Sequence, residues 1–197
     1  MTAKPMEIET VARLTAIHRP ADHPQSRHEG TAREVAELFE YLCPNSTAPQ
    51  IDRSHDGIAI AAQNPRLALN LAQLSRFMAL ELQWCRRPDL RELAIQAVNA
   101  HFGCEYSFNS RIRAAEAAGI GIDLQRALPQ WRLNALFNAE QKLVIEYTLA
   151  VVGGKVPDDL FARVVASFGE KGTVEFTAVA GFWAFWAMFL NATRPGA

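Results

Sequence analysis

Four residues in the middle of the chain have types and spacings that suit chemistry on a small molecule. Glu92 is followed twelve residues later by Cys104, and Ser107 and Arg111 lie three and seven residues beyond the cysteine. A cysteine at a helix N-terminus is expected to have a lowered thiol pKa, because the helix dipole favours the thiolate. A carboxyl group in a poorly solvated pocket can relay protons. Glu92 and Cys104 are therefore the candidate catalytic pair.

Two helices are needed to bring these side chains together. Residues three, four and seven apart share one face of an α-helix, so Glu92, Gln96 and Asn99 form one polar stripe. Gly103 is expected to end this helix, and Cys104 to begin the next. The cysteine, the serine and the arginine then share a stripe on the second helix. The two stripes are expected to meet in a small, half-buried pocket.

The stretch that holds these residues resembles the carboxymuconolactone decarboxylase and alkyl hydroperoxidase D-like superfamily. One redox branch of that superfamily carries a glutamate, eleven residues, and then Cys-x-x-Cys-x-x-x-His. Another branch carries Glu-Tyr-Glu-Trp-x-x-His in the same place. Glu92 and Cys104 match the first pattern, and Glu105, Tyr106 and Phe108 echo the second. The resemblance implies an all-α, oligomeric fold, in which Tyr106 and Phe108 are expected to be core residues or pocket walls.

Two positions depart from the redox pattern. Ser107 stands where the second cysteine is expected, and Arg111 stands where the histidine is expected. A hydroxyl group cannot form the disulfide of a thiol relay. Arg111 stays protonated at neutral pH and cannot act as a base, but its guanidinium can bind a substrate carboxylate with two hydrogen bonds. A salt bridge from Arg111 to Glu92 or Glu105 is the structural alternative.

The C-terminal part, residues 144–191, also looks like this superfamily. It reads as a helix, Gly-Gly, Pro-Asp-Asp, a helix, and a last helix that contains a glycine followed by two aromatic residues. The superfamily often has an asparagine and an arginine in this last helix, where the chain has Ala184 and Met188. The resemblance covers residues 64–191. Residues 1–63 are expected to be an N-terminal helical extension of the same single domain.

Helical patterns run through the chain, and no useful stretch alternates as a strand does, so the fold is expected to be all-α. Thr31 and Glu34 fit a capping box at the start of one helix, and Asn138 and Gln141 fit another. Gly169 is expected to end a helix. The run from Phe176 to Leu190 is expected to be a buried or subunit-interface helix, because its length of about 22 Å is short for a bilayer core of about 30 Å.

The composition excludes several classes of protein. With 197 residues and 49% hydrophobic side chains, the chain is long enough to bury a sizeable core. A formal charge of −1 gives no electrostatic case for binding nucleic acid. The three cysteines are widely spaced, and the N-terminus has no apolar signal segment. These features predict a cytoplasmic protein without a membrane partner.

We expect a homo-oligomer, such as a dimer, trimer or hexamer, that carries out cofactor-free and metal-free chemistry on a small organic acid or lactone. Proton transfer or decarboxylation would use Glu92 and Cys104, with Arg111 as the anion clamp. The other expected substrate-binding residues are Ser107, Tyr106 and Phe108. Two alternatives stay open. One is a thiol-dependent hydroperoxide reductase in which Cys104 is resolved by a remote thiol, Cys85 or Cys43. The other is a non-catalytic oligomeric binding protein.

Overall fold

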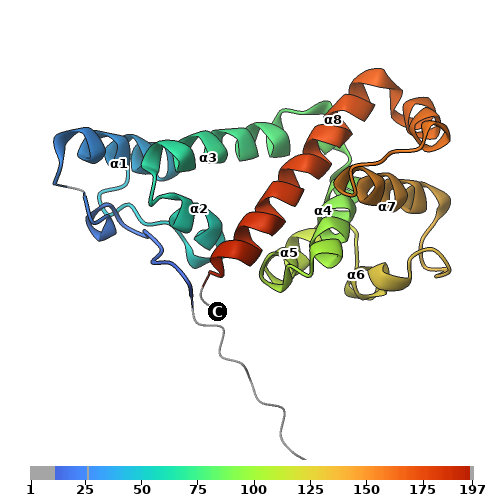
Figure 1. Cartoon of the computed structure of the whole chain (residues 1–197), viewed down its shortest axis with the longest axis horizontal. Coiled ribbons are helices and arrows are strands. Elements are labelled where there is room, and N and C mark those ends of the chain that lie inside the picture. Colours follow the sequence, from blue (N-terminus) through green and yellow to red (C-terminus); the bar gives the residue numbers. More distant parts are fainter. Residues whose placement is uncertain (1–11, 26, 196–197) are drawn as a thin grey trace, which may run out of the picture. The chain divides into compact units, whose positions relative to one another are not determined.

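The computed structural model describes residues 12–25 and 27–195, apart from the side chains of Gln83 and Cys85 (Figure 1). Within this part of the chain the protein has eight α-helices and no strand, which confirms the all-α prediction. The alkyl hydroperoxidase D-like arrangement and the oligomeric state stay predictions. The helices are α1 (Glu29–Leu42), α2 (Asp56–Ala61), α3 (Pro65–Leu80), α4 (Pro88–Phe102), α5 (Glu105–Ala117), α6 (Ile122–Ala127), α7 (Ala139–Val152) and α8 (Asp158–Thr193).

The chain forms two compact units. The first consists of Met1–Leu71 with Ala192–Ala197, and the second consists of Ala72–Asn191. The boundary falls inside α3, close to the end of the expected N-terminal extension at residue 63. All of the candidate site residues belong to the second unit. The expectation of one domain stays a prediction.

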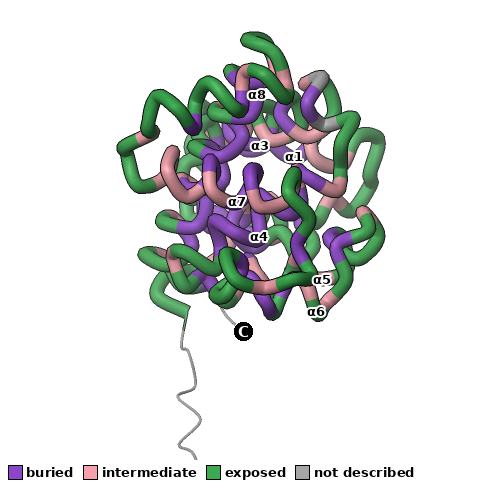
Figure 2. The backbone as a smooth tube through the Cα atoms, turned by 90° about the vertical axis from the view of Figure 1, so that its right-hand side faces the viewer, coloured by how far each residue is buried: buried purple, intermediate pink, exposed green. Residues whose placement is uncertain are grey.

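Helix α4 is the centre of the second unit. It packs against α5 and α7, and Figure 1 shows it between them. Every residue from Leu93 to Asn99 is buried, so this helix has no solvent-facing stripe over two turns (Figure 2). A helix that is buried on all sides must satisfy its polar side chains inside the protein. The polar side chains of α4 therefore need hydrogen-bond or ion-pair partners within the second unit.

Helix α8 is interrupted at Gly169, as the sequence predicts. Gly169 has φ 69° and ψ 170°, a backbone conformation outside the helical region. The part that follows packs into the second unit through Phe176, whose ring stacks on Trp84 at a centroid distance of 4.3 Å. Among the described helices, α8 is long and apolar enough to cross a membrane, but 56% of its apolar window is buried within the protein. A core helix passes the same test, so this is weak evidence for a membrane span.

The two predicted capping boxes have different outcomes. Asn138 Oδ1 accepts a hydrogen bond from the Gln141 N–H at 2.8 Å, and Gln141 Oε1 accepts one from the Asn138 N–H at 3.0 Å, which confirms the cap of α7. The Thr31 cap is wrong, because α1 already begins at Glu29 with His28 as its N-cap. The two residues before Thr31 adopt helical geometry, which places the threonine inside the first turn.

The Gly169 conformation leads to a stability prediction. Gly169→Ala should lower the free energy of unfolding by about 1–3 kcal/mol, because this region of φ and ψ is almost restricted to glycine. The cause is backbone strain and not a clash, since no atom lies within 4 Å of an added Cβ. Urea unfolding followed by circular dichroism measures the loss. Gly30→Ala is the control, since Gly30 lies in α1 with no positive φ and equally open surroundings. Equal effects of the two substitutions would contradict the strain.

Candidate functional site

A glycine turn positions the two polar stripes of the candidate site. Gly103 has a left-handed backbone conformation, with φ 58° and ψ 35°, and it ends α4. The Cys104 N–H donates a hydrogen bond to the Asn99 carbonyl at 2.9 Å, and α5 begins at the next residue. The chain therefore reverses within two residues, and α5 packs back against α4. This confirms the predicted break, and it brings the two stripes face to face.

Glu92 and Arg111 meet across these two helices in a two-pronged ion pair. Arg111 Nη2 lies 2.7 Å from Glu92 Oε1, and Arg111 Nε lies 3.0 Å from Glu92 Oε2. The Glu92 side chain is 2% exposed, whereas that of Arg111 is 29% exposed. The guanidinium carbon also lies 5.8 Å from the centroid of the Trp183 ring. The salt bridge to Glu92 that the sequence offered as the structural alternative is therefore present.

A second arginine binds the same carboxylate, and sequence reasoning missed it. Arg91 Nη2 and Nε lie 3.2 and 3.3 Å from Glu92 Oε1, and Arg91 Nη1 donates to the Ala79 carbonyl at 2.7 Å. Neighbouring residues on a helix point in different directions, so spacing alone does not predict this pair. The long arginine side chain reaches back to Glu92 while it anchors the last turn of α3. Two guanidinium groups thus share one buried carboxylate.

The rest of the α4 stripe forms a buried amide network. Gln96 Nε2 donates to the Phe108 carbonyl at 3.1 Å and to Gln125 Oε1 at 2.7 Å. Asn99 Nδ2 donates to Gln96 Oε1 at 2.9 Å, and Gln125 Nε2 donates to the Ile120 carbonyl at 2.8 Å. Asn99 Oδ1 is buried and has no hydrogen-bond partner among the described residues. The network ties α4 to α5 and α6 next to the ion pair.

Cys104 lies at the predicted helix N-terminus, but the expected lowering of its thiol pKa does not occur. The residue is the N-cap of α5 and is only 1% exposed. Burial raises the pKa of the Cys104 thiol, and a backbone hydrogen bond from Ser107 offsets this only in part. Removal from water disfavours the thiolate more than the end of the helix favours it. Cys104 is also seven residues from Arg111, about 10 Å along the axis of α5.

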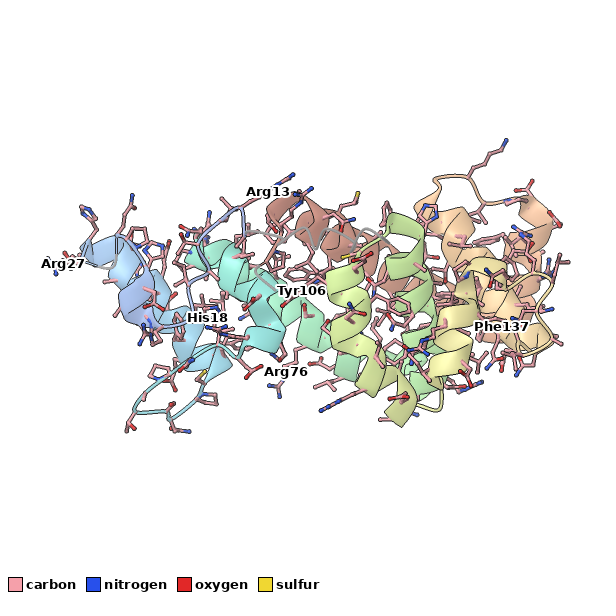
Figure 3. The ribbon with its side chains drawn as sticks, turned by 90° about the horizontal axis from the view of Figure 1, so that it is seen from below. Arg13, His18, Arg27, Arg76, Tyr106 and Phe137 are labelled. Carbon is pink, nitrogen blue, oxygen red and sulfur yellow. The ribbon has the colours of Figure 1, made fainter. Side chains whose placement is uncertain are left out.

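The remaining predicted residues lie around this centre on α5. Ser107 is buried, and Tyr106 and Phe108 are half-buried. Figure 3 shows the side chain of Tyr106 on α5. Phe108 contributes its carbonyl group to the amide network, a role that its side chain does not predict. The side chain of Cys85, the expected remote resolving thiol, lies outside what the structure describes. Of the predicted residues, the structure brings together Glu92 and Arg111 by direct contact.

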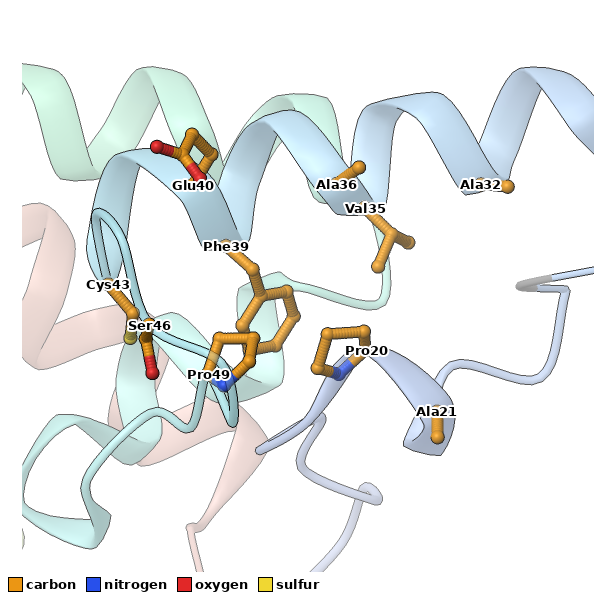
Figure 4. A pocket seen from close by; sticks show the side chains of 10 residues that line it. All are labelled: Pro20, Ala21, Ala32, Val35, Ala36, Phe39, Glu40, Cys43, Ser46 and Pro49. Carbon is orange, nitrogen blue, oxygen red and sulfur yellow. The ribbon is translucent and has the colours of Figure 1, made fainter.

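A pocket of about 440 Å³ lies elsewhere, in the first unit, between α1 and the loops around Pro20 and Pro49. Phe39 projects from α1 between these two prolines (Figure 4). The lining of the pocket also includes Cys43, whose thiol donates a hydrogen bond to the Gln50 carbonyl at 3.4 Å. None of the predicted catalytic or substrate-binding residues lines this pocket. It is therefore not the site that the sequence motif predicts.

The ion pair should carry a large share of the stability of the second unit. Arg91 binds only Oε1 of Glu92, so Arg111→Met would leave Oε2 of the buried carboxylate without its partner and should lower the free energy of unfolding by about 3 kcal/mol. Arg163→Met is a matched control, because Arg163 pairs with Glu146 at a similar 2.9 Å on the surface. Its loss should stay below about 1 kcal/mol. Equal losses in urea unfolding would show that the buried pair has no special weight.

The raised thiol pKa predicts slow alkylation of Cys104. At pH 8 iodoacetamide should label Cys104 at least about tenfold more slowly than the half-buried Cys43, because labelling needs an accessible thiolate. A raised pKa leaves less thiolate at any given pH, so the rate should climb only above the ordinary thiol pKa of about 8.5. Peptide mass mapping measures both rates, and unfolding in urea should make them equal. Labelling of native Cys104 as fast as Cys43 would overturn the effect of burial.

Comparisons of the chain with protein-family models, curated proteins and solved structures found no match. The resemblance to the carboxymuconolactone decarboxylase-like superfamily therefore stays a prediction.

Proposed function

We propose that this protein binds a small organic acid at the arginine centre around Glu92 and acts on it without a cofactor, with Glu92 as the proton-transfer group. The observation that carries the proposal is that two guanidinium groups converge on a single buried carboxylate. Their charge is only half neutralised by Glu92. A second carboxylate, supplied by a ligand, would balance it.

The centre has a donor and a route for such a ligand. Arg111 donates to Glu92 through Nε and Nη2, and no described residue accepts a hydrogen bond from its Nη1. The side chains of Arg91 and Arg111 are 17% and 29% exposed, so solvent reaches the arginines although Glu92 is covered. The Trp183 ring beside Arg111 offers a flat apolar wall. A planar carboxylate suits this combination of guanidinium and aromatic surface.

Ligand binding would also make Glu92 available for chemistry. Both oxygens of Glu92 accept hydrogen bonds from arginines. An acid that takes over one prong of Arg111 would release an oxygen of Glu92, close to the bound molecule. A carboxylate oxygen within hydrogen-bond reach of an acidic C–H group can remove its proton and return it to the same molecule. This chemistry needs neither a metal nor a thiol.

The buried thiol supports this division of roles. Cys104 is enclosed and its pKa is raised, which favours the unreactive thiol form. A hydroperoxide reductase needs an accessible thiolate and a second thiol close by, whereas the residue one turn beyond Cys104 is Ser107. These features of Cys104 and Ser107 favour proton transfer by Glu92 over the peroxidase alternative. Cys104 is assigned to packing at the start of α5.

A second candidate function is a non-catalytic oligomeric protein that keeps the ion pair for stability alone. The observation that favours it is the complete two-pronged geometry of Arg111 on Glu92, which satisfies both oxygens of the carboxylate within the chain. The apolar residues Ala184 and Met188 at two polar positions of the resemblance point the same way. The two candidates differ in whether Arg111 has a partner besides Glu92 during function.

Calorimetric titration with 2-oxo acids, hydroxy acids and lactones separates the two candidates, with the methyl ester of each acid as a ligand control. We expect at least one acid to bind and its ester not to bind. Arg111→Lys should weaken the binding by about tenfold or more, because the two-pronged contact is lost. Arg163→Lys should leave it unchanged. If no acid binds, or if Arg111→Lys has no effect on binding, the non-catalytic candidate replaces the first.

Proton transfer can be tested on the acid that binds. Incubated in D₂O, the wild type should exchange deuterium into the carbon next to the carboxyl or keto group, as followed by NMR. Glu92→Gln should stop the exchange. Cys104→Ser should not, since the thiol has no role in the step. Exchange that depends on Cys104 and not on Glu92 would reverse the assignment.

A further inference from the structure

Helix α8 carries an uncharged stripe on the face that it turns to solvent. Its members follow one another at steps of four, three, four and three residues, and they are exposed or half-exposed. This is the heptad spacing by which one helix packs along another. We call this stripe the α8 seam. The α8 seam consists of Val174, Ala178, Gly181, Phe185 and Met188.

The opposite face of α8 already serves the interior of the second unit. Phe176, Val179, Trp183 and Ala187 are buried there, and Trp183 lies against Arg111. The α8 seam is therefore a second apolar face on a helix whose first face is occupied. Val174 is 69% exposed and Met188 is 52% exposed. A solvent-facing helix stripe normally carries charged side chains, and this one has none.

We infer that the α8 seam packs against the α8 seam of a second copy of this chain, with the two helices antiparallel. The order of side-chain sizes along the stripe favours this orientation. In an antiparallel pair centred on position 183, Gly181 lies opposite Phe185 of the partner subunit, and Ala178 lies opposite Met188 of the partner subunit. The two largest side chains of the seam, Phe185 and Met188, then each meet a small residue. In a parallel pair, Phe185 would meet its own copy and Gly181 would meet its own copy.

The backbone at Gly181 has the space that this pairing requires. A Cβ atom added to Gly181 would have no atom of the protein within 4 Å. The glycine thus marks an open depression on the surface of α8, one turn before the half-exposed ring of Phe185. A two-fold axis at the level of position 183, between Gly181 and Phe185, places each ring over the depression of the other subunit. Such self-complementarity is the condition for a closed dimer interface.

A lipid surface is the other occupant that an apolar face could have. The alternation of small and large residues favours a helix, because it gives knobs and holes, whereas lipid chains need neither. The inference does not rest on the proposed binding of an organic acid. It specifies the face, the orientation and the residue pairs of the self-association that the sequence predicts only in general terms.

Sedimentation velocity of the full chain at micromolar concentration tests the interface. The wild type should sediment at twice the mass of the 21.8 kDa chain, or at a multiple of that dimer. Gly181→Leu should fill the depression and halve that mass. Its melting temperature should not fall, because the added Cβ has open space around it and leucine favours helix more than glycine does.

Leu133→Gln is the matched control, since Leu133 is 95% exposed and lies outside the α8 seam. It removes exposed apolar surface, but it should leave the mass of the assembly unchanged. A monomeric wild type, or a Gly181→Leu variant with the mass of the wild type, would overturn the inference. A monomer that floats with lipid vesicles, and does so equally with Gly181→Leu, would assign the face to membrane instead.

The orientation is tested by cross-linking. The double substitution Gly181→Cys and Phe185→Cys should give a disulfide between the introduced thiols of two subunits on mild oxidation, identified by peptide mass mapping. Gly181→Cys alone should give none between its two copies, because antiparallel helices offset these positions by about 6 Å along the axis. Efficient cross-linking by Gly181→Cys alone would mean a parallel pair and contradict the pairing of large with small residues.

Discussion

A carboxylate that is removed from water has to be neutralised, and the second unit of this protein is built around one such group. Glu92 lies at the start of the buried part of helix α4, and its neutralisation requires Arg111 of α5 and Arg91 of its own helix. Arg91 also holds the last turn of α3 through the Ala79 carbonyl. Three helices are therefore fixed in position by the charge of one side chain.

The amide network extends the same constraint along α4. Gln96 can reach both Phe108 and Gln125 only in one register of α4 against α5 and α6. Apolar packing alone would tolerate a shift of one helix along another, whereas directional hydrogen bonds do not. The polar stripe that looks like an active-site lining in the sequence thus also specifies the geometry of the fold. Stability and the proposed acid site depend on the same few residues.

The sequence predicts those features that depend on local geometry. Gly103 and Gly169 are identifiable as helix breaks because glycine adopts positive φ most readily, and the salt bridge of Arg111 to Glu92 is one of the two that the sequence offers as alternatives. Features set by three-dimensional packing cannot be predicted from local sequence patterns. The pKa of Cys104 depends on burial by distant residues, and the second cation, Arg91, depends on the reach of a flexible side chain. The Thr31 cap failed because helix boundaries are set by neighbouring contacts as well as by local signals.

The central claim is that the two arginines around Glu92 have positive charge left over for an anion. Bromide is a direct probe, because it binds where a carboxylate would and is located by its anomalous scattering. In a crystal of the wild-type protein soaked in sodium bromide, we expect an anomalous peak beside the Arg111 guanidinium, next to the Trp183 ring. Peaks only at surface cations such as Arg163, with the Glu92–Arg111 pair unchanged and no anion beside it, would contradict the account.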